Sequence, residues 1–162
     1  MTPEEHRQLV AQYEEGPALL REAWDRVPPE ARQWRPAPGK WSAHEIIVHC
    51  ADSETNSVAR LRYLLAEAEP LILGYDQDRW ATVLDYHSLP VEPAFRVIEA
   101  VRANALPILH ALTAEQLALM GRHTESGTYG VATWLGTYAA HLPIHARQLE
   151  RNLEAWDARG SA

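Results

Sequence analysis

The sequence predicts an all-α protein, a four-helix bundle with a crossover connection and short extra helices. Four long stretches repeat apolar side chains every three or four positions, which is the spacing of a helix that buries one face. Ser42–Glu45 and Thr113–Gln116 are capping boxes, which begin helices. Strand signals are few. A length of 162 residues suits one domain, which we take to cover residues 1–162.

The first two long helices are each delimited by local signals. The first is expected over residues 4–26, and Pro28-Pro29 end it. Within this helix Gly16-Pro17 interrupts the pattern, so we expect a kink or an irregular turn there. The second helix begins at the Ser42 capping box and is expected to run to about residue 67.

The second half of the chain alternates irregular and helical stretches. Residues 68–89 are expected to be irregular, with a short helix near 78–84, and they are long enough for the chain to cross over the bundle. Helical periodicity predicts a third long helix over about 91–111. The stretch GRHTESGTYG at 121–130 is expected to be a turn-rich connection, and the last helix is expected over 131–157.

The composition excludes several classes of protein. The single cysteine, Cys50, cannot form an internal disulfide and fits a reducing compartment, so we expect a cytoplasmic protein and Cys50 in the core. A net charge of −7 does not favour nucleic acid or an anionic membrane as a partner. No apolar run is long enough for a membrane span, and the N-terminus has no signal-peptide pattern.

Two histidines in the last helix have the spacing of metal ligands. His141 and His145 are four residues apart, so both side chains lie on one helix face and can approach one ion. Imidazole nitrogen suits zinc, nickel, iron or copper. Pro143 lies between them, where its ring disturbs the helix. This disturbance either re-aims the two imidazoles or is a tolerated kink.

A third histidine is expected to complete the site. His49 lies on the apolar face of the second helix, and an inward neutral imidazole needs a polar partner. A shared cation satisfies His49, His141 and His145 together. Asp52 follows His49 by three residues, so it either orients that imidazole or is an exposed acid near the helix start.

These motifs together resemble a known family. WSAHEIIVHCADSETNSVARLRYLL (41–65), YDQDRWA (75–81) and LGTYAAHLPIHARQL (135–149) are similar to the DinB/YfiT-like superfamily of bacterial metal-binding four-helix bundles. The resemblance implies a divalent metal held by His49, His141 and His145, with open positions for water. It also implies a metal-dependent hydrolase or a transferase that uses a low-molecular-weight thiol.

Three functions remain open at this point. The first is hydrolysis of a small molecule through metal-bound water, with Asp52 as the catalytic carboxylate. The second is transfer of a low-molecular-weight thiol, for which Arg60, Arg122 and Arg147 are candidates for a basic rim. The third is a non-catalytic metal-binding or stress-response protein. Zinc or nickel is the expected cofactor, with iron or manganese as alternatives.

We also expect a homodimer. Trp24, Trp34 and Trp80 offer more aromatic surface than one small core needs, and bundles of the resembled family often pair.

Overall fold

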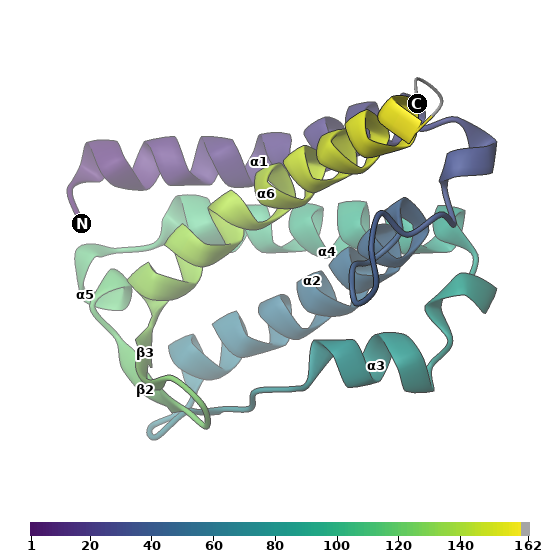
Figure 1. The fold of residues 1–162 in the computed structure, drawn as a ribbon. Coiled ribbons are helices and arrows are strands. Elements are labelled where there is room, and N and C mark those ends of the chain that lie inside the picture. The colour runs from purple at the N-terminus through teal and green to yellow at the C-terminus, as the bar shows by residue number, and fades with distance from the viewer. Residues whose placement is uncertain (160–162) are drawn as a thin grey trace.

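The computed structural model describes residues 1–159 and is built from four long helices (Figure 1). The predicted bundle is confirmed, and each long helix begins and ends within about two residues of its expected bounds. These helices are α1 (Pro3–Asp25), α2 (Ala43–Ala66), α4 (Val91–Ala111) and α6 (Val131–Ala158).

The four helices have an up-down-down-up order. Helix α1 packs on α4 and α6, and α2 packs on the same two helices, so α1 and α2 lie on a diagonal of the bundle. In Figure 1, α1 and α6 run in one direction while α2 and α4 run in the other. Because α2 and α4 are parallel, residues 67–90 must return along the length of the bundle, which confirms the predicted crossover.

Short elements lie in the connections between the long helices. They are η1 (Pro29–Ala31), β1 (Leu71–Ile72), α3 (Gln77–Val83), η2 (Tyr86–Ser88), α5 (Ala114–Leu117), β2 (Met120–His123) and β3 (Gly127–Gly130). The short helix expected near 78–84 is α3.

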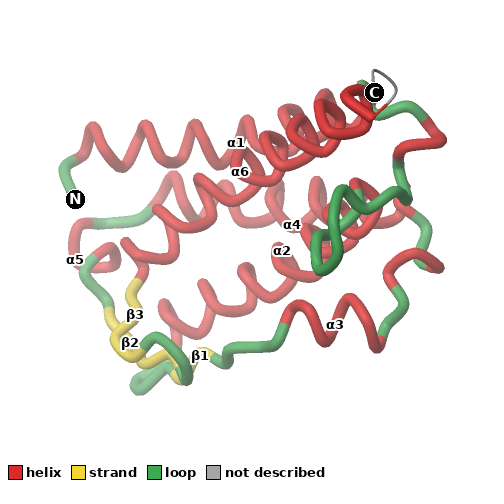
Figure 2. The backbone as a smooth tube through the Cα atoms, in the orientation of Figure 1, coloured by secondary structure: helices red, strands yellow, loops and turns green. Residues whose placement is uncertain are grey.

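A small sheet stands where the sequence predicted only turns (Figure 2). Strands β2 and β3 form an antiparallel hairpin within 120–130, and β1 pairs with β2 in parallel. Strands this short do not show the alternation by which strands are predicted. The sheet joins the crossover to the hairpin that leads into α6.

The capping box before α2 has both of its hydrogen bonds. The backbone N–H of Glu45 donates to Ser42 Oγ at 3.2 Å, and the N–H of Ser42 donates to Glu45 Oε2 at 2.9 Å. The start of α2 is thereby fixed, and with it the direction in which His49 points two turns later.

Gly16 and Pro17 do not break α1, which stays helical through both residues. A Cβ atom on Gly16 would lie 2.6 Å from Nη1 of Arg102, a side chain that enters from α4. Pro17 has no N–H to donate to the carbonyl of Tyr13, and Arg102 Nη1 donates to that carbonyl instead. The pair that resembles a helix breaker therefore accommodates a buried arginine.

The three tryptophans behind the homodimer prediction find partners within one chain. Trp24 is buried against Phe95. Trp34 contacts Trp156, and Trp80 stacks near Tyr75 at a centroid distance of 4.4 Å. The homodimer stays a prediction, but these side chains no longer motivate it.

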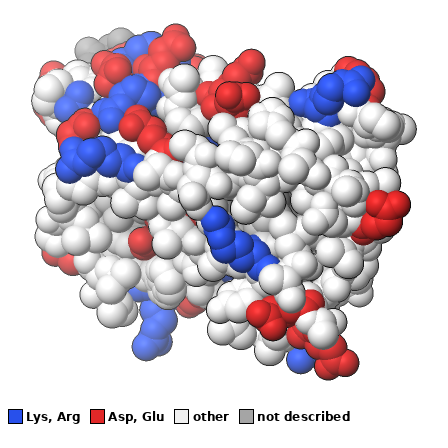
Figure 3. Space-filling model, turned by 180° about the vertical axis from the view of Figure 1, so that it is seen from behind, with Lys and Arg blue, Asp and Glu red and all other residues white. Residues whose placement is uncertain are grey.

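The surface carries charges of both signs. On the face in Figure 3, basic side chains occur singly or among acidic ones, and a basic side chain also lies in the otherwise largely uncharged middle. None of the helices within residues 1–159 is long and apolar enough to cross a membrane.

Candidate metal centre

His49 on α2 and the pair His141 and His145 on α6 come together as expected. One nitrogen from each ring lies within 4.8 Å of the corresponding nitrogens of the other two. Ring centroids are 5.7 Å apart for His49 and His141, 5.0 Å for His49 and His145, and 4.6 Å for His141 and His145. Three imidazoles at this separation can share one cation after small side-chain movements.

Hydrogen bonds fix which nitrogen is free on the two α6 histidines. His141 Nδ1 donates to Glu54 Oε1 at 2.8 Å, and His145 Nδ1 donates to Gln148 Oε1 at 2.9 Å. With the proton on Nδ1, the lone pair of each ring is on Nε2, the arrangement usual for metal-ligating histidine. A divalent cation therefore fits these two side chains.

The third histidine has an unsatisfied nitrogen. His49 is only 3% exposed and packs against Trp41. Its Nδ1 is buried and has no hydrogen-bond partner among residues 1–159. A buried polar atom without a partner is costly, and such atoms often mark a ligand or functional site. This orphan nitrogen supports a bound cation beside His49.

Burial keeps the imidazoles of His49 and His145 neutral. Burial, and next the proximity of His145 and His141, lowers the pKa of His49 to about 2. Burial, and next the proximity of His141, lowers the pKa of His145 to about 4. Only neutral imidazole can bind a metal, so both rings are prepared for it at neutral pH.

The carboxylate at the site is Glu54, which the sequence analysis did not single out. Glu54 is completely buried, and Arg102 binds both of its oxygens, from Nε at 2.9 Å and from Nη2 at 2.8 Å. Burial alone would raise the pKa of Glu54, but the hydrogen bond with His141 and the charge of Arg102 outweigh it, so its pKa is lowered. Glu54 is therefore an anion that holds the His141 ring in place.

Asp52 lies away from the histidines. Its Oδ2 accepts a hydrogen bond from the Tyr86 hydroxyl at 2.5 Å, and it makes no hydrogen bond to His49 within the described chain. The hydrogen bond with Tyr86 directs the Asp52 carboxylate toward η2. Its catalytic role stays a prediction without a contact to support it. Cys50 is buried in the core as expected, and burial raises the pKa of its thiol.

Helix α6 continues through Pro143, which is buried between the two ligand candidates. Pro143 cannot donate to the carbonyl of Ala139, so one helical hydrogen bond is missing just before the site. Whether this change aims the imidazoles stays a prediction.

A pocket of about 460 Å³ opens onto the three histidines. Its walls come from α2, α6, the crossover and the β2–β3 hairpin. They include Ser53, Arg60, Tyr75, His123 and Tyr138. Of the three arginines proposed for a basic rim, Arg60 lines this pocket, whereas Arg122 and Arg147 do not.

His123, which the sequence analysis did not single out, belongs to this wall. Its Nδ1 accepts hydrogen bonds from the backbone N–H groups of Glu125 and Ser126 at 3.2 and 3.3 Å. The ring proton is therefore on Nε2, which can donate to a molecule in the pocket.

The lowered pKa values predict how acid affects metal affinity. Protons compete with a metal only below the pKa of each imidazole, so His49 and His145 should not compete above about pH 4. A single proton that competes with the metal lowers the affinity by at most about tenfold per pH unit. We therefore expect nickel affinity to fall by no more than about tenfold between pH 6 and pH 5. Calorimetric titration at both pH values measures this. A fall of about a thousandfold would mean that all three rings titrate as exposed histidines.

Comparison with known proteins places the chain in a family. The model of the DinB superfamily matches residues 12–149. The chain belongs to the DinB superfamily. The family resemblance seen in the sequence motifs is thereby confirmed, and the three histidines lie within the matched residues.

Two similar proteins carry the name "Putative metal-dependent hydrolase". One, from Oceanobacillus iheyensis, is 34% identical over 107 residues, which cover 66% of this chain and 62% of that protein. Another, from Bacillus cereus, is 31% identical over 111 residues, covering 68% of this chain and 64% of its own length. The match thus spans less than two thirds of either relative. Their shared name indicates metal dependence and gives no substrate.

A solved structure shows the same fold. YfiT from Bacillus subtilis, described as "a probable metal-dependent hydrolase with an unusual four-helix bundle topology", superposes with a TM-score of 0.84. The match covers 95% of this chain and 90% of YfiT at 23% identity. At that identity the likeness establishes the fold alone.

Proposed function

We propose that this chain is a metal-dependent hydrolase acting on a small molecule, with zinc or nickel held by His49, His141 and His145. The observation that carries the proposal is the hydrogen bonding of His141 and His145, which leaves both Nε2 atoms free beside the unsatisfied ring of His49. Three nitrogen ligands suit either metal. The names of the relatives support the same activity.

The chemistry of such a site follows from its donor set. When bound, a divalent cation with three protein ligands keeps an open position, where it lowers the pKa of a water and polarises a substrate oxygen. The chain supplies the rest. Glu54 holds the orientation of His141, and the Nε2–H of His123 is a hydrogen-bond donor at the pocket wall. Asp52 is a weaker candidate for proton transfer because it faces Tyr86.

Hydrolysis is tested with the metal-loaded protein and a panel of small esters and amides. We expect turnover that depends on added zinc or nickel and falls by about a hundredfold or more in His141→Ala, since losing only a hydrogen-bond partner of a metal ligand costs about 10–100-fold. His110→Ala removes an exposed histidine on α4 and should leave turnover unchanged. Equal turnover by the parent and His141→Ala would contradict the proposal.

Thiol transfer is the second candidate, and the position of Arg60 in the metal pocket favours it. A guanidinium there can bind a carboxylate of a low-molecular-weight thiol. The same protein is assayed with a thiol and an aromatic chloride as electrophile. Metal-dependent thioether formation without ester or amide hydrolysis would favour transfer over hydrolysis.

A further inference from the structure

Arg60 is held in place at the wall of the metal pocket. Its Nη1 donates to the Tyr138 hydroxyl at 3.1 Å, and its Nη2 donates to the carbonyl of Leu73 at 2.5 Å. The guanidinium carbon lies 5.7 Å from the centroid of the Tyr75 ring. These contacts come from α6 and the crossover, so they fix a side chain that begins on α2.

Within the part of the chain that the structure describes, Arg60 forms no salt bridge. No carboxylate oxygen within residues 1–159 lies within 4.0 Å of its guanidinium nitrogens. The pocket contains two acids, Asp76 and Glu125, and both are exposed. Asp76 Oδ1 accepts from the backbone N–H of Arg79 at 2.9 Å, which directs it to the start of α3. Within residues 1–159 the Arg60 guanidinium therefore forms no salt bridge with either acid.

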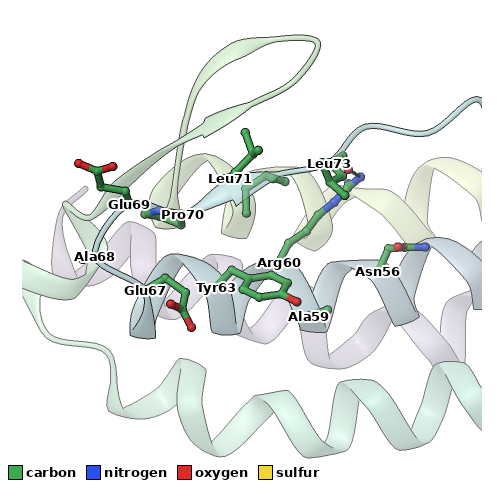
Figure 4. Close-up of a pocket in the computed structure, with 11 residues that line it drawn as sticks. Asn56, Ala59, Arg60, Tyr63, Glu67, Ala68, Glu69, Pro70, Leu71 and Leu73 are labelled. Carbon is green, nitrogen blue, oxygen red and sulfur yellow. Dashed lines mark hydrogen bonds between the residues drawn. The ribbon is translucent and has the colours of Figure 1, made fainter.

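Arg60 is close to the histidines and open to solvent. Tyr138, which receives its hydrogen bond, has its ring 5.6 Å from the ring of His141. Figure 4 shows the Arg60 side chain extending from α2 toward Leu73, beside a larger hollow of about 960 Å³ that it also lines. A molecule can therefore reach both Arg60 and the three histidines from the same pocket.

We propose that Arg60 binds an anionic oxygen group of the substrate, a carboxylate or a phosphate, while the reacting group of the same molecule approaches His49, His141 and His145. This inference rests on the proposed function. A guanidinium has five N–H donors in a planar fork, and two protein hydrogen bonds leave donors free. Arginine pairs well with carboxylate and phosphate oxygens in this geometry. The substrate class is accordingly a small anionic molecule.

Three hydroxamates test the inference by calorimetry on the nickel-loaded protein. All three present the same metal-binding group, but acetohydroxamate has a neutral tail, whereas succinic monohydroxamate ends in a carboxylate and phosphonoacetohydroxamate in a phosphonate. The parent should bind at least one anionic compound about tenfold or more tighter than acetohydroxamate. The preferred anionic compound then distinguishes carboxylate from phosphate.

Arg60→Gln should abolish that preference while leaving the affinities for nickel and acetohydroxamate unchanged. Arg62→Gln is the matched control, because Arg62 is exposed on the same helix and binds Asn104 outside the pocket. Equal affinity of the parent for all three compounds would overturn the role of Arg60, and so would an unchanged preference in Arg60→Gln. Failure of the parent to bind either nickel or zinc would instead overturn the proposed function.

Discussion

Replacing Arg102 with methionine is expected to lower the free energy of unfolding by about 3–5 kcal/mol, the usual cost of removing one partner of a buried ion pair. The side chains of Arg102 and Glu54 are 1% and 0% exposed. Without the guanidinium, the Glu54 carboxylate would lose its counter-charge, and the carbonyls of Tyr13 and Tyr138 would lose a donor. Urea unfolding followed by circular dichroism measures the change.

A control variant and a double variant make this measurement specific. Arg96→Met replaces an exposed arginine on the same helix and should change stability by less than about 0.5 kcal/mol. In Arg102→Met/Glu54→Gln the uncompensated charge is gone, so we expect a large part of the lost stability to return. An Arg102→Met protein that unfolds at the urea concentration of the parent would refute the buried pair as a stabilising element.

The second large effect concerns the metal. His49→Ala, His141→Ala and His145→Ala should each weaken binding of zinc or nickel by at least about a hundredfold, because each removes one of only three protein ligands. The bundle should survive, since its main apolar clusters are built from other side chains. Calorimetric titration measures the metal affinity of each variant. The control is His110→Ala, which removes an exposed histidine on α4 and should leave the affinity unchanged.

The pattern among these variants identifies the ligands. Loss of binding in only the two α6 variants would remove His49 from the ligand set and leave its orphan Nδ1 without an explanation. Unchanged affinity in all three would place the metal elsewhere and end the functional proposal.

The predictable parts of this protein are those that local sequence determines. Helical periodicity located the four long helices, and the Ser42 capping box located the start of α2, because caps and buried faces depend on residues a few positions apart. The four-residue spacing of His141 and His145 put both on one face for the same reason. His49 followed from the apolar face on which it lies.

The missed parts depend on contacts between distant segments. Glu54 looks like an ordinary acid in a polar stretch, and only Arg102, 48 residues away, makes it a buried anion beside His141. Gly16 and Pro17 resemble a helix break because their role is to accommodate that same arginine. Asp52 was chosen by its spacing from His49, but Tyr86, 34 residues away, determines where it points.

Elemental analysis of protein purified without an affinity tag tests the three-histidine metal centre most directly. After incubation with nickel or zinc and removal of free metal, the parent should retain about one divalent ion per chain. The triple variant His49→Ala/His141→Ala/His145→Ala should retain almost none under the same conditions. Equal metal content in the parent and the triple variant would contradict the proposed centre.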